Sequence, residues 1–138
     1  MNTETRLKHH ELTGTVIRTF YRVYNELGVG FLESVYEQAL SIALHEAGVP
    51  SERQVEMAVR YHGRVVGEFR ADMIVAGLVI LEVKAVRTLD PAHVAQLLNY
   101  LRVTDLEVGL LLNFGHRPQF RRLLFDNHRK EVVELSPA

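Results

Sequence analysis

The chain has 138 residues, of which 47% are hydrophobic and 24% charged, and its formal net charge is -1. This length suits one domain that can bury its own hydrophobic core without staples. The chain has no cysteine, which excludes disulfides, thiolate metal sites and a cysteine nucleophile. The charge balance argues against a protein that coats nucleic acid through bulk charge. It does not exclude an enzyme acting on nucleic acid, because acidic metal ligands offset basic contacts.

No apolar run approaches the roughly 18 residues that a membrane-spanning helix needs. The stretch from Met1 to Glu11 is polar and lacks the apolar core of a signal peptide. We therefore expect a cytoplasmic protein with no membrane partner. Its single domain would cover residues 1–138, with residues 1–9 forming a frayed terminus.

Two amphipathic helices are predicted at the start of the chain. Apolar residues at helical spacing run from about His10 to Leu27, and Gly28 can end this helix in a left-handed conformation. A short turn leads to a second helix from about Leu32 to Ala47, which the following glycine and proline stop.

The spacing of apolar residues then changes from helical to alternating. This alternation predicts a half-buried strand over Val55–Tyr61 and, after a hairpin turn, a second strand over Val65–Val75. The segment Leu78–Val86 is apolar except at Glu82 and Lys84, which favours a central strand covered on both faces.

The rest of the chain adds one helix and two strands. Asp90 before Pro91 is a capping residue followed by proline at the first helical position, and it predicts a helix to about Val103. Glu107–Asn113 is predicted as a buried strand, and Phe120–Phe125 as an edge strand or a helical turn. The expected order is α-α-β-β-β-α-β-β, an α/β fold in which helices pack on a mixed sheet.

Two charged residues lie inside a predicted apolar strand, and they indicate a functional site. Glu82 and Lys84 are two positions apart, so their side chains leave the same face of the strand. Burying an unpaired charge costs several kcal/mol, and a buried glutamate–lysine pair alone gains little against that cost. A divalent cation bound to the carboxylate offsets it better. Asp72, on the preceding strand, would supply a second carboxylate.

The register of the hairpin decides whether the two carboxylates meet. A two-residue loop would place Asp72 on the face away from Glu82. A three-residue loop over residues 76–78 pairs Val75 with Val79 and sets Asp72 directly opposite Glu82. Opposed residues have Cβ atoms about 4.5–5.5 Å apart, which suits shared oxygen ligation of Mg²⁺ or Mn²⁺. We predict the three-residue loop.

Five segments carry a resemblance to a known family. They are Gly30-x-x-Glu33-x-x-Tyr36, Arg70-Ala71-Asp72, Leu81-Glu82-Val83-Lys84-Ala85-Val86, His93-x-x-Gln96-x-x-x-Tyr100 and the run from Gly109 to Gly115. In this order and spacing they resemble the GxxExxY family, a branch of the PD-(D/E)XK nuclease superfamily, over roughly Leu12 to Phe125. Ala71 stands where the superfamily's name has proline, a position that is not a ligand.

The resemblance implies a role for each residue at the centre of the site. Asp72 and Glu82 would be metal ligands, with Glu33 as a third carboxylate. Lys84 would position or activate the attacking water. Gln96 would contact the site or a metal-bound water.

Further residues are predicted to contact the substrate: Tyr36, Arg70 and Tyr100. Alternation places Arg70 on the same face as Asp72, where it can hold a phosphate. A salt bridge from Arg70 to Glu33 or Glu68 is the alternative.

Two other polar residues receive structural interpretations. Glu37, one helical turn after Glu33, is expected to be solvated. Asn113 ends a buried strand and is expected to cap a turn.

Basic residues are frequent near the end of the chain, at Arg117, Arg121, Arg122, Arg129 and Lys130. They form either a phosphate-contacting edge or an ordinary solvated surface. The charge pattern favours the solvated surface.

The predicted function is that of a Mg²⁺- or Mn²⁺-dependent nuclease that hydrolyses phosphodiester bonds of nucleic acid, with DNA favoured over RNA. One alternative is a non-catalytic module that keeps the nuclease fold and binds nucleic acid or protein. Another is a sugar hydrolase that uses Glu33 with Glu82. Lys84 and the absence of tryptophan count against it. A homodimer is a further hypothesis, because cutting two strands needs two sites or two events.

Overall fold

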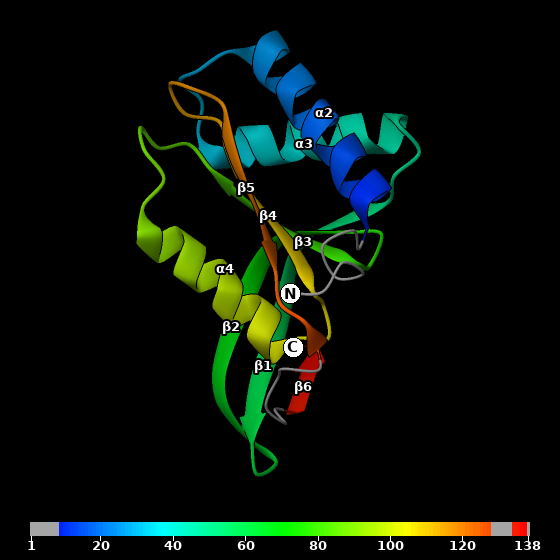
Figure 1. The fold of residues 1–138 in the computed structure, drawn as a ribbon, viewed down its shortest axis with the longest axis vertical. Coiled ribbons are helices and arrows are strands. Elements are labelled where there is room, and N and C mark those ends of the chain that lie inside the picture. Colours follow the sequence, from blue (N-terminus) through cyan, green and yellow to red (C-terminus); the bar gives the residue numbers. More distant parts are fainter. Residues whose placement is uncertain (1–8, 128–133, 138) are drawn as a thin grey trace.

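Helices cover both faces of one mixed sheet in the computed structural model, which describes residues 9–127 and 134–137 (Figure 1). The elements are α2 (His10–Leu27), α3 (Glu33–Glu46), β1 (Ser51–Tyr61), β2 (Arg64–Val75), β3 (Val79–Lys84), α4 (Pro91–Val103), β4 (Val108–Asn113), β5 (Gln119–Leu124) and β6 (Glu134–Pro137). The predicted order is confirmed, and β6 is an additional strand. The predicted frayed terminus, except His9, lies outside the described residues, as do Arg129 and Lys130.

The sheet has the strand order β5-β4-β3-β2-β1-β6. Strands β3 and β4 are parallel, which requires the crossover that α4 provides, and all other neighbours are antiparallel. The last predicted segment is therefore an edge strand, β5, and not a helical turn. Strand β6 forms the other edge and pairs with the Met57–Arg60 part of β1.

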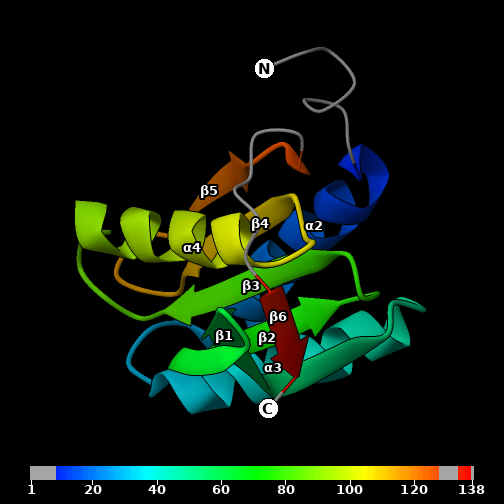
Figure 2. The ribbon, with the colours of Figure 1, turned by 90° about the horizontal axis from the view of Figure 1, so that it is seen from below.

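Alternate residues of the central strands enter two separate cores. On one face, Leu81 and Leu110 join Phe20, Tyr36 and other buried side chains of α2 and α3. On the other face the core is built around α4, with Ile80, Leu97, Leu101 and Leu111 among its members. Figure 2 shows α4 on one side of the sheet and α3 on the other. Helices on both faces explain why β3 and β4 are apolar almost throughout.

Helix ends follow the local sequence signals. Gly28, with φ 73°, ends α2 and donates its backbone N–H to Tyr24 O. The side chain of Asp90 accepts a hydrogen bond from Ala92 N at 2.8 Å, and Asp90 N donates to His93 Nδ1 at 3.1 Å. His93 is thus part of the predicted cap of α4. Among the described residues, no helix is long and apolar enough to cross a membrane.

The buried Asn113 clamps the ends of β3 and β4 together. Its Oδ1 accepts hydrogen bonds from Val86 N and Gly115 N, both at 3.0 Å, and its Nδ2 donates to Val86 O at 2.9 Å. A Cβ atom on Gly115 would lie 1.8 Å from Val86 O, so only glycine allows this approach. The predicted turn-capping role of Asn113 is confirmed. The clamp also fixes the strand end that carries Lys84.

Gly115→Ala should lower the free energy of unfolding by about 2–3 kcal/mol, because the added Cβ forces backbone movement in a packed region. Midpoints of urea unfolding measure this loss. Gly67→Ala on β2 is the matched control, since a Cβ there meets no atom within 4 Å. The control should stay within about 0.5 kcal/mol of the wild type. Equal losses in the two variants would contradict the close approach at Gly115.

Candidate metal site

The hairpin between β2 and β3 has the predicted three-residue loop. Leu78 N donates to Val75 O at 2.9 Å, and Val75 pairs with Val79. The ladder continues only as far as the pair Met73–Leu81. The predicted register is therefore confirmed, and it brings Asp72 to the position facing Glu82.

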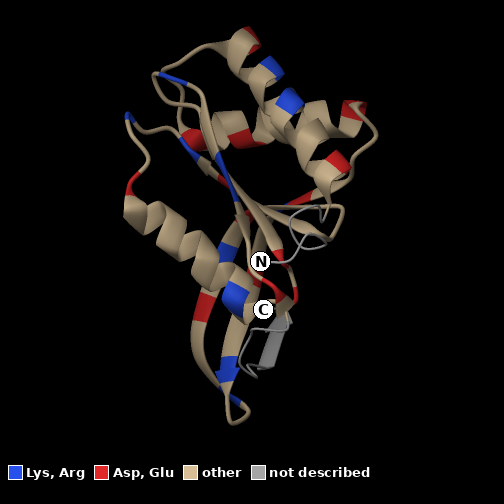
Figure 3. Ribbon diagram, viewed as in Figure 1, with Lys and Arg blue, Asp and Glu red and all other residues tan. Residues whose placement is uncertain are grey.

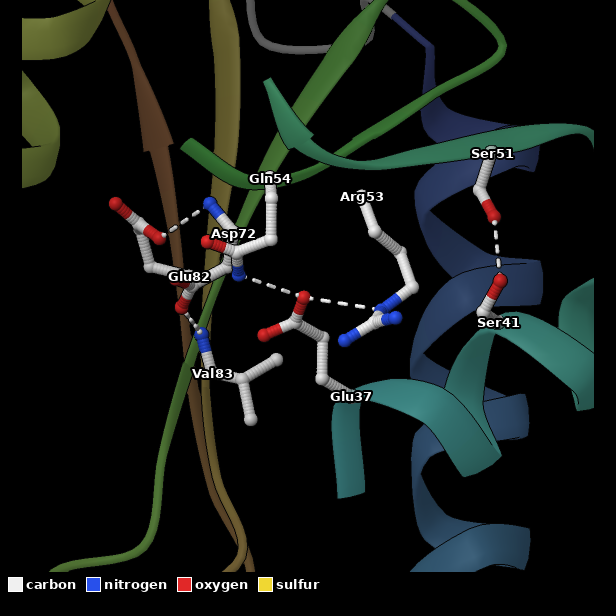
Figure 4. A network of polar contacts seen from close by, with 8 residues as sticks. All are labelled: Glu37, Ser41, Ser51, Arg53, Gln54, Asp72, Glu82 and Val83. Carbon is white, nitrogen blue, oxygen red and sulfur yellow. Dashed lines mark hydrogen bonds and ion pairs between the residues drawn. The ribbon is translucent and has the colours of Figure 1, made fainter. Parts of the chain in front are cut away.

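Where the backbone pairing of β2 with β3 stops, the carboxylates of Asp72 and Glu82 accept the next hydrogen bonds. Asp72 N donates to Glu82 Oε2 at 3.1 Å, and Val83 N donates to Asp72 Oδ2 at 2.8 Å (Figure 4). Each carboxylate thus accepts a backbone N–H from the opposite strand. These reciprocal bonds hold the two side chains next to each other while satisfying N–H groups that the ladder leaves free.

The strands change face at the same place. Residues three apart on a regular strand face opposite sides, yet Ala71 and Ile74 both pack in the core around α4. On β1, Gln54 lies across from Asp72, between two regular pairs, and its φ is 53°. A left-handed non-glycine residue costs about 1 kcal/mol or more and persists only where its surroundings hold it. Alternation is therefore broken beside the carboxylates.

Glu82 is strongly perturbed. Burial raises its pKa to about 9, and the neighbouring charge of Asp72 and a side-chain hydrogen bond to Asp72 add to the rise. Lys84, on the same strand face, acts in the opposite direction. The pKa of Tyr100 is also raised, first by partial burial and then by the charges of Glu82 and Asp72. The carboxylate pair therefore carries more negative charge than this environment favours.

The two carboxylates fit a hard divalent cation. Besides the hydrogen bond that joins the two carboxyl groups, none of the described residues donates to Asp72 Oδ1 or Glu82 Oε1, so both oxygens can serve as ligands once Glu82 has lost its proton. Within the described ranges no group of three or more His, Asp or Glu side chains is arranged to hold a metal ion. Mg²⁺ is commonly bound by one or two carboxylates and keeps several waters, so a two-carboxylate site suits it.

Glu37 corrects the prediction that it would be solvated. It is only 4% exposed, and its Oε1 accepts hydrogen bonds from Arg53 Nε at 3.1 Å and Gln54 Nε2 at 2.8 Å. Burial raises the pKa of Glu37, and the charge of Asp72 contributes to the rise against the hydrogen bond from Gln54. In Figure 4, Gln54 and Asp72 lie between Glu37 and Glu82. The pKa of Glu37, on α3, therefore depends in part on the charge of Asp72.

The signal for Glu37 was present in the sequence. It precedes Leu40 by three positions and Leu44 by seven, which places it on the buried face of the helix. Arg53 and Gln54 precede the predicted start of the strand at Val55 and match no motif. Only the pairing of β1 with β2 reveals them.

The structure brings some predicted residues to the carboxylates and not others. Lys84 shares the strand face of Glu82, and among the described residues its ammonium makes no ion pair. Tyr100 stacks on Phe69, with ring centroids 4.2 Å apart and planes at 15°, close enough for the carboxylates to raise its pKa. Gln96, one turn before Tyr100 on α4, is exposed and forms no hydrogen bond with a described residue.

Glu33 and Tyr36 occupy other surroundings. Glu33 is exposed at the start of α3, and no hydrogen bond or ion pair among the described residues joins it to Asp72 or Glu82. Tyr36 is fully buried, and its hydroxyl donates to Gly28 O at 2.6 Å. Tyr36 therefore anchors the loop before α3 and has no surface to offer a substrate.

Arg70 forms an ion pair with Glu56 across the β1–β2 ladder, and not with either glutamate considered from the sequence. Its neighbours Phe69 and Ala71 face α4, so Arg70 points to the opposite side. The break in alternation at Asp72 explains why simple parity misjudged its position.

Glu82→Gln should remove a pH-dependent loss of stability in the metal-free protein. The pKa of Glu82 is raised from 4.5 to about 9, so the folded state binds more protons than the unfolded state between these values. Wild-type stability should therefore fall as pH rises through this range. The amide carries no charge and can donate to Asp72, so the variant should melt above wild type at about pH 8 and match it near pH 4.

Thermal melts in EDTA across this pH range test the point. Glu52→Gln is the control, because it removes a charge from an exposed position on β1. A Glu82→Gln profile parallel to wild type would overturn the assignment of a proton to Glu82.

Comparisons with known proteins agree with the fold. A family model described as the PD-(D/E)XK nuclease superfamily matches residues 10–123. A solved structure titled "Crystal structure of SSO0001" superposes with a TM-score of 0.52 at 23% identity over 69% of this chain. This chain spans only 52% of that one, and at such identity the likeness concerns the fold alone. A search of curated proteins gave no match. The narrower GxxExxY branch remains a prediction from the motifs.

Proposed function

Because the chain belongs to the PD-(D/E)XK nuclease superfamily, we propose that it is a divalent-metal-dependent nuclease that hydrolyses phosphodiester bonds, of DNA in preference to RNA. The observation that carries this proposal is the reciprocal bonding of Asp72 and Glu82 at the end of the β2–β3 ladder. It presents two carboxylates side by side, with Lys84 on the strand face of Glu82.

In this proposal Asp72 and Glu82 hold Mg²⁺ or Mn²⁺, which when bound neutralises phosphoryl charge and supplies an activated water. Glu82 must lose its proton to act as a ligand, so metal affinity should increase with pH. The Lys84 ammonium stabilises negative charge that develops on the phosphoryl oxygens. The hydroxyl of Tyr100, whose pKa is raised by burial and then by the charges of Glu82 and Asp72, would donate a hydrogen bond to a phosphate oxygen.

We assign the role of third carboxylate to Glu37 in place of Glu33. Arg53 and Gln54 both bond to Glu37 Oε1, so this side chain is fixed in orientation. None of the described residues donates to its other oxygen. That oxygen can accept a hydrogen bond from water on the α3 side of Asp72. Ordered groups that orient a ligand in this way commonly change activity by about 10–100-fold.

Asp72→Asn and Lys84→Ala should fail in different ways. Asp72→Asn keeps an oxygen that can accept from Val83 N but removes a charged ligand, so both Mn²⁺ affinity and cleavage should fall. Lys84→Ala removes no ligand, so Mn²⁺ should still bind while turnover drops by about 10²-fold or more, as for a lost oxyanion donor. Calorimetric titration with Mn²⁺ and cleavage of labelled DNA and RNA measure the two effects.

A purely structural ion-pair cluster gives another pattern, in which both variants melt at lower temperature and the wild type binds no Mn²⁺. If the wild type neither binds millimolar Mn²⁺ nor cleaves DNA or RNA, the nuclease proposal is wrong. A non-catalytic binding module would then take its place.

Glu37→Gln and Glu33→Gln form a matched pair on α3, one turn apart. Glu37→Gln should lower kcat/KM by about tenfold or more, as loss of an orienting group does. Glu33→Gln removes an exposed charge and should change kcat/KM less than about twofold, because the residue contacts neither ligand. Cleavage rates at saturating Mn²⁺ compare them. The opposite ranking would return the third carboxylate to Glu33.

A further inference from the structure

Three loops meet at one end of the sheet and border an open cavity of about 580 Å³. They follow α2, β3 and β4, and their lining parts are residues 29–31, 85–87 and 114–116. Figure 1 shows these three connections gathered at the upper left, beyond the ends of the central strands. Ala85, in the lining, follows Lys84 in the chain and packs with the core of α2 and α3.

The charge of this cavity is one-sided. Among the described residues, Arg87 and His116 are the lining residues with ionisable side chains, and none of those that line the cavity is a carboxylate. The chain as a whole carries a net charge of -1, so the cavity differs from the average surface. Figure 3 shows basic residues on the loops after β3 and β4. This lining complements an anionic group such as a phosphate.

Each wall of the cavity is held by a separate hydrogen bond. The Tyr36 hydroxyl donates to Gly28 O and accepts from Phe31 N at 3.3 Å, which fixes the first loop. Tyr24 Oη donates to His116 O at 2.8 Å and fixes the third loop. The second loop is fixed by the bonds of Asn113 to Val86. A ligand would therefore meet a preformed cavity and would not have to order the loops.

An aromatic ring stands in the wall of the same cavity. Phe31 is 46% exposed and packs edge-on against Tyr36, with ring centroids 5.9 Å apart. Sites for single-stranded nucleic acid combine basic groups for the backbone with exposed rings on which bases stack. We propose that this cavity binds one unpaired nucleotide of the substrate strand. Phe31 stacks on the base, and Arg87 and His116 hold its phosphate. This inference rests on the proposed nuclease function.

A second cavity continues the same pattern. It has a volume of about 410 Å³ and is lined by Tyr21, Thr88, Leu89, Gln119, Phe120 and Arg121. Among the described residues it again joins an exposed aromatic ring, Phe120 at 38%, with a cation and without a carboxylate. Thr88 follows Arg87 in the chain, so the loop after β3 contributes to both cavities.

Binding in EDTA separates this site from the chemistry. Fluorescence anisotropy with a short labelled single-stranded DNA should give a Kd about tenfold higher for Arg87→Gln and for Phe31→Leu, as for one lost phosphate contact or base stack. Arg87→Gln should also lower the slope of log Kd against log salt by about 0.7, whereas Phe31→Leu should leave it unchanged. Arg64→Gln is the control, because it removes an exposed arginine at the distant β1–β2 turn. The control should bind as wild type does.

Wild-type affinity in both cavity variants, or no binding by the wild type itself, overturns the proposal. A Phe31→Leu loss on the matched duplex as large as on the single strand also overturns it, because a paired base cannot stack on the ring. The two levels fail separately. If binding depends on Arg87 and Phe31 but no Mn²⁺-dependent cleavage occurs, the nucleotide-binding cavity is supported and the nuclease function is contradicted. If both variants cleave with an unchanged KM, the nuclease function is supported and the nucleotide-binding cavity is contradicted.

Discussion

The reciprocal bonds between the carboxylates and the backbone at the end of the β2–β3 ladder are the constraint on which the site depends. Backbone pairing stops after Met73 and Leu81, and the side chains of Asp72 and Glu82 accept the N–H groups that come next. The carboxylates therefore complete the sheet as well as forming the site. Their positions follow from backbone geometry, which is more rigid than a side-chain contact on a loop. A change at either residue should therefore act on the fold and on the proposed chemistry together.

Negative charge gathers around this joint from both faces of the sheet. Glu82 lies on the face of α4 and Tyr100, whereas Glu37 reaches Asp72 from α3. Arg53 and Gln54 restrain Glu37, whereas the pKa of Glu82 is lowered by the backbone hydrogen bond from Asp72 N and, to a smaller extent, by the charge of Lys84. Protonation of Glu82 and binding of a cation are thus competing ways of relieving one repulsion. The left-handed Gln54 sits at the same rung, so conformational strain and charge repulsion are stored together.

Most of the fold could be predicted from the sequence because its signals are local. Asp90 with Pro91 marked the start of α4, and the apolar spacing predicted both N-terminal helices. The hairpin register was predicted because only a three-residue loop sets Asp72 opposite Glu82. The site was predicted only in part, since Glu37 and Gln54 acquire their environment from pairing across the sheet. Strict alternation along β2 predicted Arg70 on the same face as Asp72. This prediction was wrong because β1 and β2 both change face at Asp72. A period of two cannot foresee a break that depends on a neighbouring strand. The superfamily motif predicted Asp72, Glu82 and Lys84 as site residues, and the resemblance named Glu33 as the third carboxylate while Glu37 was expected to be solvated.

The meander of β1, β2 and β3 has a consequence for the path of folding. Asp72 and Glu82 are ten residues apart on one hairpin, so a short loop closure is enough to bring them together. Pairing of β3 with β4 must wait for the α4 crossover, and Glu37 arrives from a helix far earlier in the chain. Local contacts form faster than distant ones. We therefore expect the two carboxylates to meet while the hairpin is still open to water, before either core closes over them. Water would screen their repulsion until α3 and α4 dock, so the docking of the helices should be the step most sensitive to acid and to divalent ions.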